Sequence, residues 1–334
     1  MGRIGFCCKF VEPHPKKVFE SVEGYNTGVT TVAWLNRQTR EAAEERLWSI
    51  MVNNLNTTYN LVSKVAEYEE NRRMVRLSSD ILPMYTENSW SYFWRRSDVI
   101  NHLCTGFGKI GELARRSDVR LSFHPGQFTV LASADPNIVD RSIAEFEYHV
   151  DMARWMGYGN KFQDFKINVH ISGKQGPEGI RRAYSKLSTE ARNTITIENE
   201  ENVWGLDSCL ELADLCPIVL DIHHCWINSG EYIQVNDARV QRVQDSWRGV
   251  RPAMHYSVSR EDLLADHSAD CLPDMKELLA KGYKKQQLRA HSDFYWNTAV
   301  NQWASSFAQH FDIQCESKAK NLASAKFAKF VSQN

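Results

Sequence analysis

The feature that most constrains the fold is a series of short β-branched and apolar runs, separated by longer amphipathic stretches, along nearly the whole chain. Such runs are typical of buried strands, and the stretches between them have the apolar spacing of helices. We expect strands at Arg3–Cys8, Met74–Ser79, Val119–His124, Phe165–His170, Thr194–Glu198, Ile218–His223, Ala253–Ser257 and Gln287–His291. Helical stretches include Arg40–Tyr68, Arg95–Arg116, Ile138–Trp155 and Asp207–Leu215.

Strands that alternate with helices favour right-handed crossovers and a parallel sheet. Eight such units favour closure into a (β/α)8 TIM barrel, and a length of 334 residues is compatible with one barrel. An open doubly wound sheet is the alternative, although no G-x-G-x-x-G motif follows the first strand, as it would in a dinucleotide-binding version. We therefore predict one barrel domain over residues 1–334, with a C-terminal helical extension at about 310–334.

Charge and composition limit the partners only weakly. The 40 Lys and Arg residues and 41 Asp and Glu residues give a net charge of -1, so any contact with DNA must come from a local basic patch. No stretch approaches the ~18 apolar residues of a membrane span, and no apolar signal segment begins the chain. None of the eight cysteines forms a C-x-x-C pair, which argues against a zinc ribbon. We expect a monomer that binds no membrane and acts inside the cell, in the cytoplasm or nucleoid (or in an infected host cell, if the chain is viral).

Polar side chains follow most of the expected strands. Histidines stand at or near six strand-end positions, which are His124, His170, His223, His224, His255 and His291. His267 lies in the loop after the seventh strand, and Glu198 and Asp221 lie at the ends of the fifth and sixth. Because the carboxyl ends of barrel strands meet at one face, these side chains are expected to converge. Imidazole and carboxylate groups together suit Zn²⁺, Mn²⁺ or Fe²⁺, so the pattern predicts a metal site.

At these positions the sequence resembles the UV damage endonuclease family, of which endonuclease IV is a structural relative. The matching segments occur in the family's order over roughly residues 1–293 and are Arg76–Asp80, Phe123–Phe128, Val169–Gly173, Ile197–Asn199, Leu220–His224 and His255–Ser257. The resemblance implies an endonuclease that hydrolyses phosphodiester bonds with the help of metal ions. It would nick the strand immediately 5′ to UV photoproducts such as pyrimidine dimers, so its partner would be damaged double-stranded DNA.

The resemblance also implies two or three divalent metal ions, generally Mn²⁺ with Zn²⁺ as the alternative, in the barrel mouth. The implied ligands are His124, His170, Glu198, Asp221, His224, His255 and His267. Glu198 would bridge two ions, His224 and His267 would hold a third, and catalysis would depend on Glu198, Asp221 and His255. Alignment of the eighth strand places His291, a further candidate ligand, where the family usually has a glutamate. Ala253 stands where the family usually has a lysine, so the number of ions stays open.

Recognition of damage requires more than the metal site. Damaged nucleotides unpair easily, so an enzyme that flips them out gains selectivity, and a planar side chain can fill the gap. Gln127 and Phe128 would form this wedge, and Phe6 would line the damage pocket. The alternatives are a loop aromatic packed on the barrel for Phe128 and simple core packing for Phe6. Further contacts with DNA are expected from Lys174, Tyr256, Ser257 and Arg260.

Other functions are compatible with parts of this pattern. An apurinic-site endonuclease of the endonuclease IV type would share the metal cluster. A sugar isomerase barrel also binds metals, but its site relies on carboxylates and a lysine, whereas histidines dominate here. A barrel that only binds metal or DNA would need no bridging carboxylate. The Gln127–Phe128 pair and the Ser78–Asp80 segment favour UV lesions.

Overall fold

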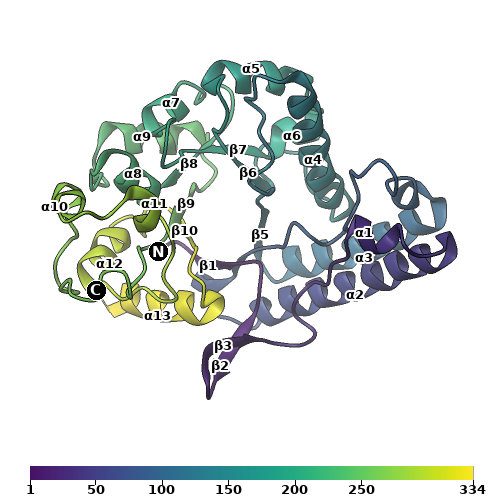
Figure 1. The fold of residues 1–334 in the computed structure, drawn as a ribbon, viewed down its shortest axis with the longest axis horizontal. Helices are drawn as coiled ribbons and strands as arrows, with labels where there is room; N and C mark the ends of the chain where they lie inside the picture. Colours follow the sequence, from purple (N-terminus) through teal and green to yellow (C-terminus); the bar gives the residue numbers. More distant parts are fainter. Residues whose placement is uncertain (334) are drawn as a thin grey trace.

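The computed structural model describes residues 1–333, and eight parallel strands within them close into a barrel (Figure 1). Each strand pairs with its neighbours in chain order, and the last pairs with the first. The barrel strands are β1 (Ile4–Cys7), β4 (Met74–Arg76), β5 (Arg120–Phe123), β6 (Lys166–His170), β7 (Ile195–Glu198), β8 (Ile218–Asp221), β9 (Ala253–Tyr256) and β10 (Asp312–Cys315). The predicted TIM barrel is confirmed.

Helices surround the strands on the outside (Figure 1). They are α1 (Val32–Leu35), α2 (Arg40–Ala66), α3 (Ser97–Arg116), α4 (Pro136–Trp155), α5 (Gly176–Lys186), α6 (Thr189–Thr194), α7 (Leu206–Leu210), α8 (Ile222–Ser229), α9 (Ala238–Ser246), α10 (Met275–Ala280), α11 (Lys285–Leu288), α12 (Thr298–Ser305) and α13 (Lys320–Gln333). Short 3₁₀ turns lie at η1 (Glu70–Arg72) and η2 (Phe93–Arg95). No helix within residues 1–333 combines the length and apolar character that a membrane span requires.

The outer helices begin at capping side chains and pack closely. Thr39 caps α2 by accepting a hydrogen bond from the Ala42 amide, and Asp135 caps α4 in the same way. The α2 and α3 helices approach one another at Gly106, where an added Cβ would lie only 2.7 Å from a methyl group of Leu55. The missing side chain at Gly106 thus lets the two long helices pack directly against each other.

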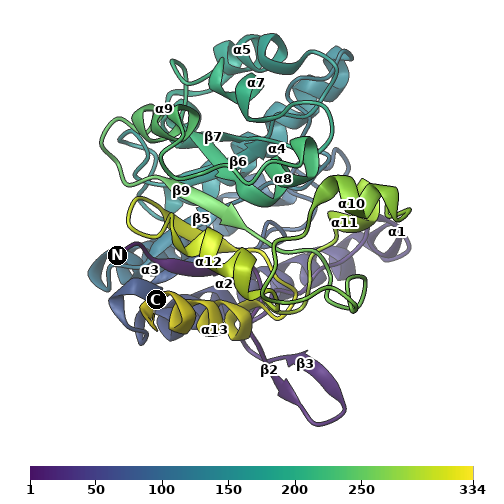
Figure 2. The same cartoon turned by 90° about the vertical axis from the view of Figure 1, so that its left-hand side faces the viewer.

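A β-hairpin of β2 (Val11–His14) and β3 (Lys17–Ser21) follows β1 and was not predicted from the sequence. It projects away from the barrel in both views (Figures 1 and 2). Val18 on this hairpin is 52% exposed, whereas Val11 is buried and its amide binds Asn321 of α13. The base of the hairpin is therefore anchored to the last helix.

The closing strand differs from the prediction. Residues 287–291 contain the end of α11 and a single bridge between His291 and Ser259, and the eighth strand is β10. The apolar run of β10 is interrupted by Asp312 and Gln314, which concealed it in the sequence. Gln314 is buried beside Cys7 of β1, and Asp312 accepts hydrogen bonds from arginines at the amino end of the barrel.

The same correction applies to the segment 310–334, which was predicted to be a helical extension. It supplies the closing strand β10, and α13 packs against β1 and β10. Residues 312–315 are thus part of the barrel, so Glu316, which follows them, lies at the mouth.

Buried polar side chains support the mouth from below. On β6, Lys166, Asn168 and His170 alternate with apolar residues and so share one face of the strand. Asn168 donates a hydrogen bond to Glu198 of β7, and Lys166 Nζ lies 3.1 Å from His255 Nε2 of β9. The β6 strand therefore holds two of the predicted site residues in place.

Candidate metal centre

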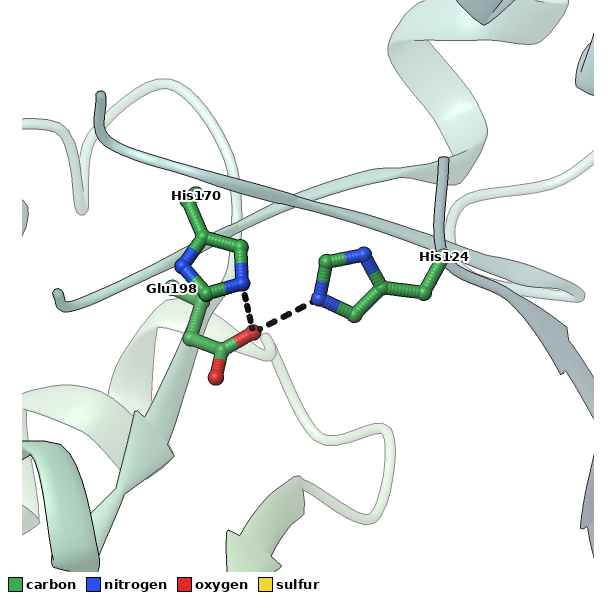
Figure 3. A group of neighbouring side chains, drawn as sticks. All are labelled: His124, His170 and Glu198. Carbon is green, nitrogen blue, oxygen red and sulfur yellow. Dashed lines mark hydrogen bonds and ion pairs between the residues drawn. The ribbon is translucent and has the colours of Figure 1, made fainter. Parts of the chain in front are cut away.

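Glu198, at the end of β7, is fully buried in the centre of the predicted site. Its Oε2 atom faces two histidines, with His124 Nε2 at 3.1 Å and His170 Nε2 at 3.7 Å (Figure 3). Its Oε1 atom faces two others, with His255 Nδ1 at 3.0 Å and His224 Nδ1 at 3.5 Å. Because the two oxygens face different sets of side chains, this carboxylate has the geometry to bridge two cations.

A second group of potential ligands includes His255, whose Nδ1 atom also faces Glu198. Asp221, His255 and Glu316 each offer an atom within 4.8 Å of the others. Glu316 follows β10 directly, lies 3.3 Å from His255 Nδ1, and forms an ion pair with Arg76 at the end of β4. Glu316 therefore takes the position at the eighth strand that the sequence alignment gave to His291.

The buried groups are suited to a bound cation. Asp221 Oδ2 is buried and has no hydrogen-bond partner among the residues described, and burial raises the pKa of this carboxyl well above its ordinary value. A carboxylate oxygen in this position is costly unless a cation neutralises it. Burial lowers the pKa of His124, and it lowers that of His170 to about 4. A lowered pKa favours the neutral imidazole, which keeps a lone pair for a metal.

Two basic side chains contact residues of these groups. Arg76 pairs with Glu316, and Lys166 contacts His255. Burial lowers the pKa of Lys166 to about 7. Burial alone would raise the pKa of Glu198, but the adjacent His255 and His170 keep it well below its ordinary value.

The turn after β8 separates two neighbouring histidines. The prediction continued this strand to His223, but β8 ends at Asp221, whose side chain accepts a hydrogen bond from the His224 amide at 2.8 Å and begins α8. His224 consequently faces Asp221 and Glu198. His223 is directed elsewhere and stacks on Trp226, with ring centroids 5.7 Å apart.

Within residues 1–333, six of the eight predicted ligands fall into four groups that could hold a metal ion. The six are His124, His170, Glu198, Asp221, His224 and His255. The other two belong to none of these groups. His267 lies near Trp296 and His291 near His223, with ring centroids 6.5 and 6.1 Å apart.

Sequence reasoning missed two acidic residues that the structure adds to these groups, Glu201 and Glu316. Glu201 lies three residues beyond Glu198, in the same loop. The signal for Glu316 was its position after a short run that alternates polar and apolar residues, which is the spacing of a strand with one polar face.

The predicted DNA-binding residues divide into exposed and buried ones. Phe128 is 85% exposed in the loop after β5, and Gln127, Lys174 and Arg260 are exposed as well. Three residues are buried in the structure, which are Phe6, Tyr256 and Ser257. The Tyr256 hydroxyl donates a hydrogen bond to Asn301 at 2.6 Å, and Phe6 packs against Phe10. Their predicted contact with DNA finds no support in this placement.

Comparison with known proteins gives a consistent result along the chain. The family described as UV-endonuclease UvdE matches residues 2–332. A UV DNA damage endonuclease of Bacillus thuringiensis subsp. konkukian is 24% identical over 319 residues, which cover 90% of this chain and 88% of that protein. The protein of the same name from Bacillus velezensis is 26% identical over 249 residues, covering 72% and 74%.

Solved structures agree on the fold. The crystal structure of SacUVDE has a TM-score of 0.72 at 22% identity and covers 100% of this chain and 99% of its own. Endonuclease IV from Thermus thermophilus has a TM-score of 0.53 at 12% identity and covers 83% and 95%. With a family match across nearly its whole length and a histidine and carboxylate cluster at the barrel mouth, this chain belongs to the UV-endonuclease UvdE family.

Proposed function

We propose that this protein is a UV damage endonuclease that nicks DNA immediately 5′ to photoproducts such as pyrimidine dimers. The observation that carries the proposal is the buried Glu198, whose two oxygens face two sets of potential metal ligands at the barrel mouth. Membership of the UV-endonuclease UvdE family supports the same conclusion. The substrate would be damaged double-stranded DNA, bound by a monomer.

The proposed centre has two principal positions for a divalent cation. His124, His170 and Glu198 would hold one ion, and Asp221, His255 and Glu316 would hold the other, with Glu198 between them. Mixed imidazole and carboxylate ligands suit Mn²⁺, and Zn²⁺ is the alternative. When bound, such ions activate water and neutralise charge on a phosphate.

The protein's own residues position these ligands. Asn168 donates to Glu198 Oε2 and fixes the carboxylate, and Lys166 contacts the His255 nitrogen that faces away from Glu198. Asn199 donates to the Asp221 carbonyl at 3.0 Å, and its own side-chain oxygen accepts from the Asp221 amide at 2.9 Å. Such outer contacts orient ligands and sustain their affinity.

Residues at the rim would recognise the damaged duplex. Gln127 and Phe128 are exposed directly after the His124 segment, where they can enter the stack once a damaged nucleotide has flipped out. Lys174 and Arg260 are exposed cations that can contact phosphates. The exposed Phe128 favours the wedge over a ring packed on the barrel.

Nicking of three end-labelled duplexes of one sequence tests the proposal. One duplex carries a single pyrimidine dimer, one an abasic site, and one no lesion. We expect a cut immediately 5′ to the dimer, loss of this cut with EDTA, and recovery when Mn²⁺ is added. Cutting of the abasic duplex alone would instead show an apurinic-site endonuclease. Cutting that is insensitive to EDTA would contradict the proposed centre.

A further inference from the structure

Two apolar side chains are unusually exposed at the barrel mouth. Phe128, in the loop after β5, is 85% exposed, and Val203, in the loop after β7, is 71% exposed. Among residues 1–333 they are the two most exposed large apolar side chains. The proposed wedge accounts for Phe128, whereas Val203 has no part in the barrel core or in the proposed metal centre.

We propose that Val203 is a second damage-recognition residue, which inserts its side chain against the bases beside the lesion while Phe128 inserts from the neighbouring loop. The inference rests on the proposed function and deepens its account of how damaged DNA is selected. Proteins that open or kink a duplex commonly insert apolar side chains between base steps. Such a contact is gained mainly where the stack is already weakened, so it favours damaged over intact DNA.

The loops that carry the two side chains line a common pocket of about 210 Å³. Gln127, next to Phe128, and Asn202, next to Val203, both line it. Strand β6 lies between β5 and β7 in the barrel, and its last residue, His170, lines the pocket as well. A duplex positioned over the proposed ligand His170 would therefore meet both loops.

The charge of the loop after β7 determines which part of DNA it can contact. Residues 198–205 contain three glutamates and no lysine or arginine. Arg289 pairs with Glu201, which leaves a net negative charge on the loop and its partner. Such a loop repels phosphates, so it has to approach DNA between them, at the bases. An apolar side chain at its exposed point is suited to this contact.

Hydrogen bonds fix the turn that presents Val203. The Glu200 amide donates to the Trp204 carbonyl at 3.0 Å, and the Glu200 carboxylate accepts from the Trp204 amide at 3.2 Å. The Trp204 indole donates to the Gly173 carbonyl at 2.7 Å, which ties the turn to the loop after β6. Because the backbone is held and a valine side chain has few rotamers, insertion of Val203 costs little conformational entropy.

Nicking kinetics of the Mn²⁺-loaded, full-length protein test the inference. The substrate is a duplex with one pyrimidine dimer, and an intact duplex of the same sequence serves as the competitor, whose inhibition constant reports affinity for undamaged DNA. Val203→Ala should raise the KM for the dimer duplex by about tenfold, the effect of two buried methyl groups. The kcat should stay the same, because no proposed ligand is changed, and so should the inhibition constant.

Three further variants serve as controls. Val203→Leu keeps an apolar side chain and should bind the dimer duplex as the wild type does. Val203→Thr keeps the shape but adds a hydroxyl, so it should lose about as much as Val203→Ala. Val18→Ala is the matched control, because Val18 is 52% exposed on the projecting hairpin, and it should have wild-type kinetics. Thermal melting checks that each variant is folded.

The outcomes separate this inference from the proposed function. If the wild type nicks the dimer duplex and Val203→Ala or Val203→Thr has the same KM, Val203 makes no apolar contact with the bases and only the inference is wrong. Equal losses of affinity for the dimer and intact duplexes would also overturn it, because Val203 would then be a general contact. The same holds if Val18→Ala loses as much as Val203→Ala. A wild type that does not nick the dimer duplex would contradict the proposed function itself.

Discussion

Buried carboxylates have different partners at the two ends of the barrel. At the amino end, Asp312 is saturated by the protein: it accepts from Arg120 Nη1 at 2.7 Å, Arg251 Nε at 2.9 Å and the Arg3 amide at 2.7 Å. At the carboxyl end, Glu198 faces histidines, and Asp221 Oδ2 has no hydrogen-bond partner in the described chain. Asp312, which is surrounded by arginines of the protein, stabilises the fold. Within residues 1–333, Glu198 and Asp221 have no such arginine partners and are suited to bind a divalent metal ion.

Strand β10 runs from one end of the barrel to the other, and the carboxylate that follows it has both kinds of partner. It begins at Asp312 and is followed directly by Glu316 at the mouth. Glu316 pairs with Arg76 but also lies 3.3 Å from His255 Nδ1. Against the burial that would raise it, Arg76 and His255 hold the pKa of Glu316 well below its ordinary value. One ligand of the proposed centre is therefore kept ionised by the protein itself.

The largest effect is expected from Glu198→Gln at the carboxyl end. The amide keeps the shape but can no longer bridge two cations, so nicking of a dimer duplex should fall by roughly a hundredfold or more, since even the outer contacts of a metal site are worth 10–100-fold. The melting temperature of the metal-free protein should fall somewhat, because the amide cannot keep the buried ion pairs that Glu198 forms with His124 and His255. Rates on the dimer duplex and melting curves measure the two effects. Activity near the wild-type level would contradict the proposed role of Glu198.

At the amino end, Asp312→Ala is expected to reduce the stability of the fold. This change leaves Arg120 and Arg251 without their common partner, so the free energy of unfolding should fall by about 2–4 kcal/mol. Denaturant unfolding measures this loss. Asp214→Ala, which removes an exposed pair with Arg181, is the control and should cost under about 1 kcal/mol. Equal losses in the two variants would show that Asp312 has no special role in stability.

At the mouth surface, Phe128→Ala should weaken DNA binding without affecting Asp312 or the carboxylates of the proposed metal centre. Stacking of one aromatic ring on a base is worth ~1–3 kcal/mol, so affinity for a dimer duplex should fall by roughly ten- to a hundredfold. The loss should be smaller on a duplex that already has a gap, where no stack needs repair. Equal losses on damaged, gapped and intact duplexes would mean that Phe128 is a general contact or a folding residue.

The smallest effect is expected from Arg260, an exposed residue after β9 that pairs with Asp262. If Arg260 neutralises one phosphate, Arg260→Ala should reduce the slope of log affinity against log salt by about one unit. Titrations at several salt concentrations measure the slope. A slope equal to that of the wild type would remove Arg260 from the interface.

Prediction from the sequence was most successful where strands are apolar throughout. The strands before Glu198 and Asp221 are apolar or β-branched up to the acidic residue, and these short runs located them. It failed at β10, where Asp312 and Gln314 have their own polar partners inside the fold, so burial of polar residues concealed the strand.

The site was predictable to the extent that its residues end strands or follow them directly. His124 and His170 are of this kind, and each joins a ligand group. Glu201 was missed because its position beside His224 depends on how the loop after β7 folds. Buried partners such as Lys166 were missed because the sequence around a charged strand residue does not show which residue of another strand it contacts. For Lys166 this residue is His255.

Metal content tests the contrast between the two ends most directly. Wild type, Glu198→Gln and Asp312→Ala would be loaded with Mn²⁺, dialysed against metal-free buffer and analysed for bound ions per chain. We expect the wild type and Asp312→Ala to retain the same number, at least two, and Glu198→Gln to retain fewer. Equal metal content in Glu198→Gln and the wild type, or none in the wild type, would contradict the account.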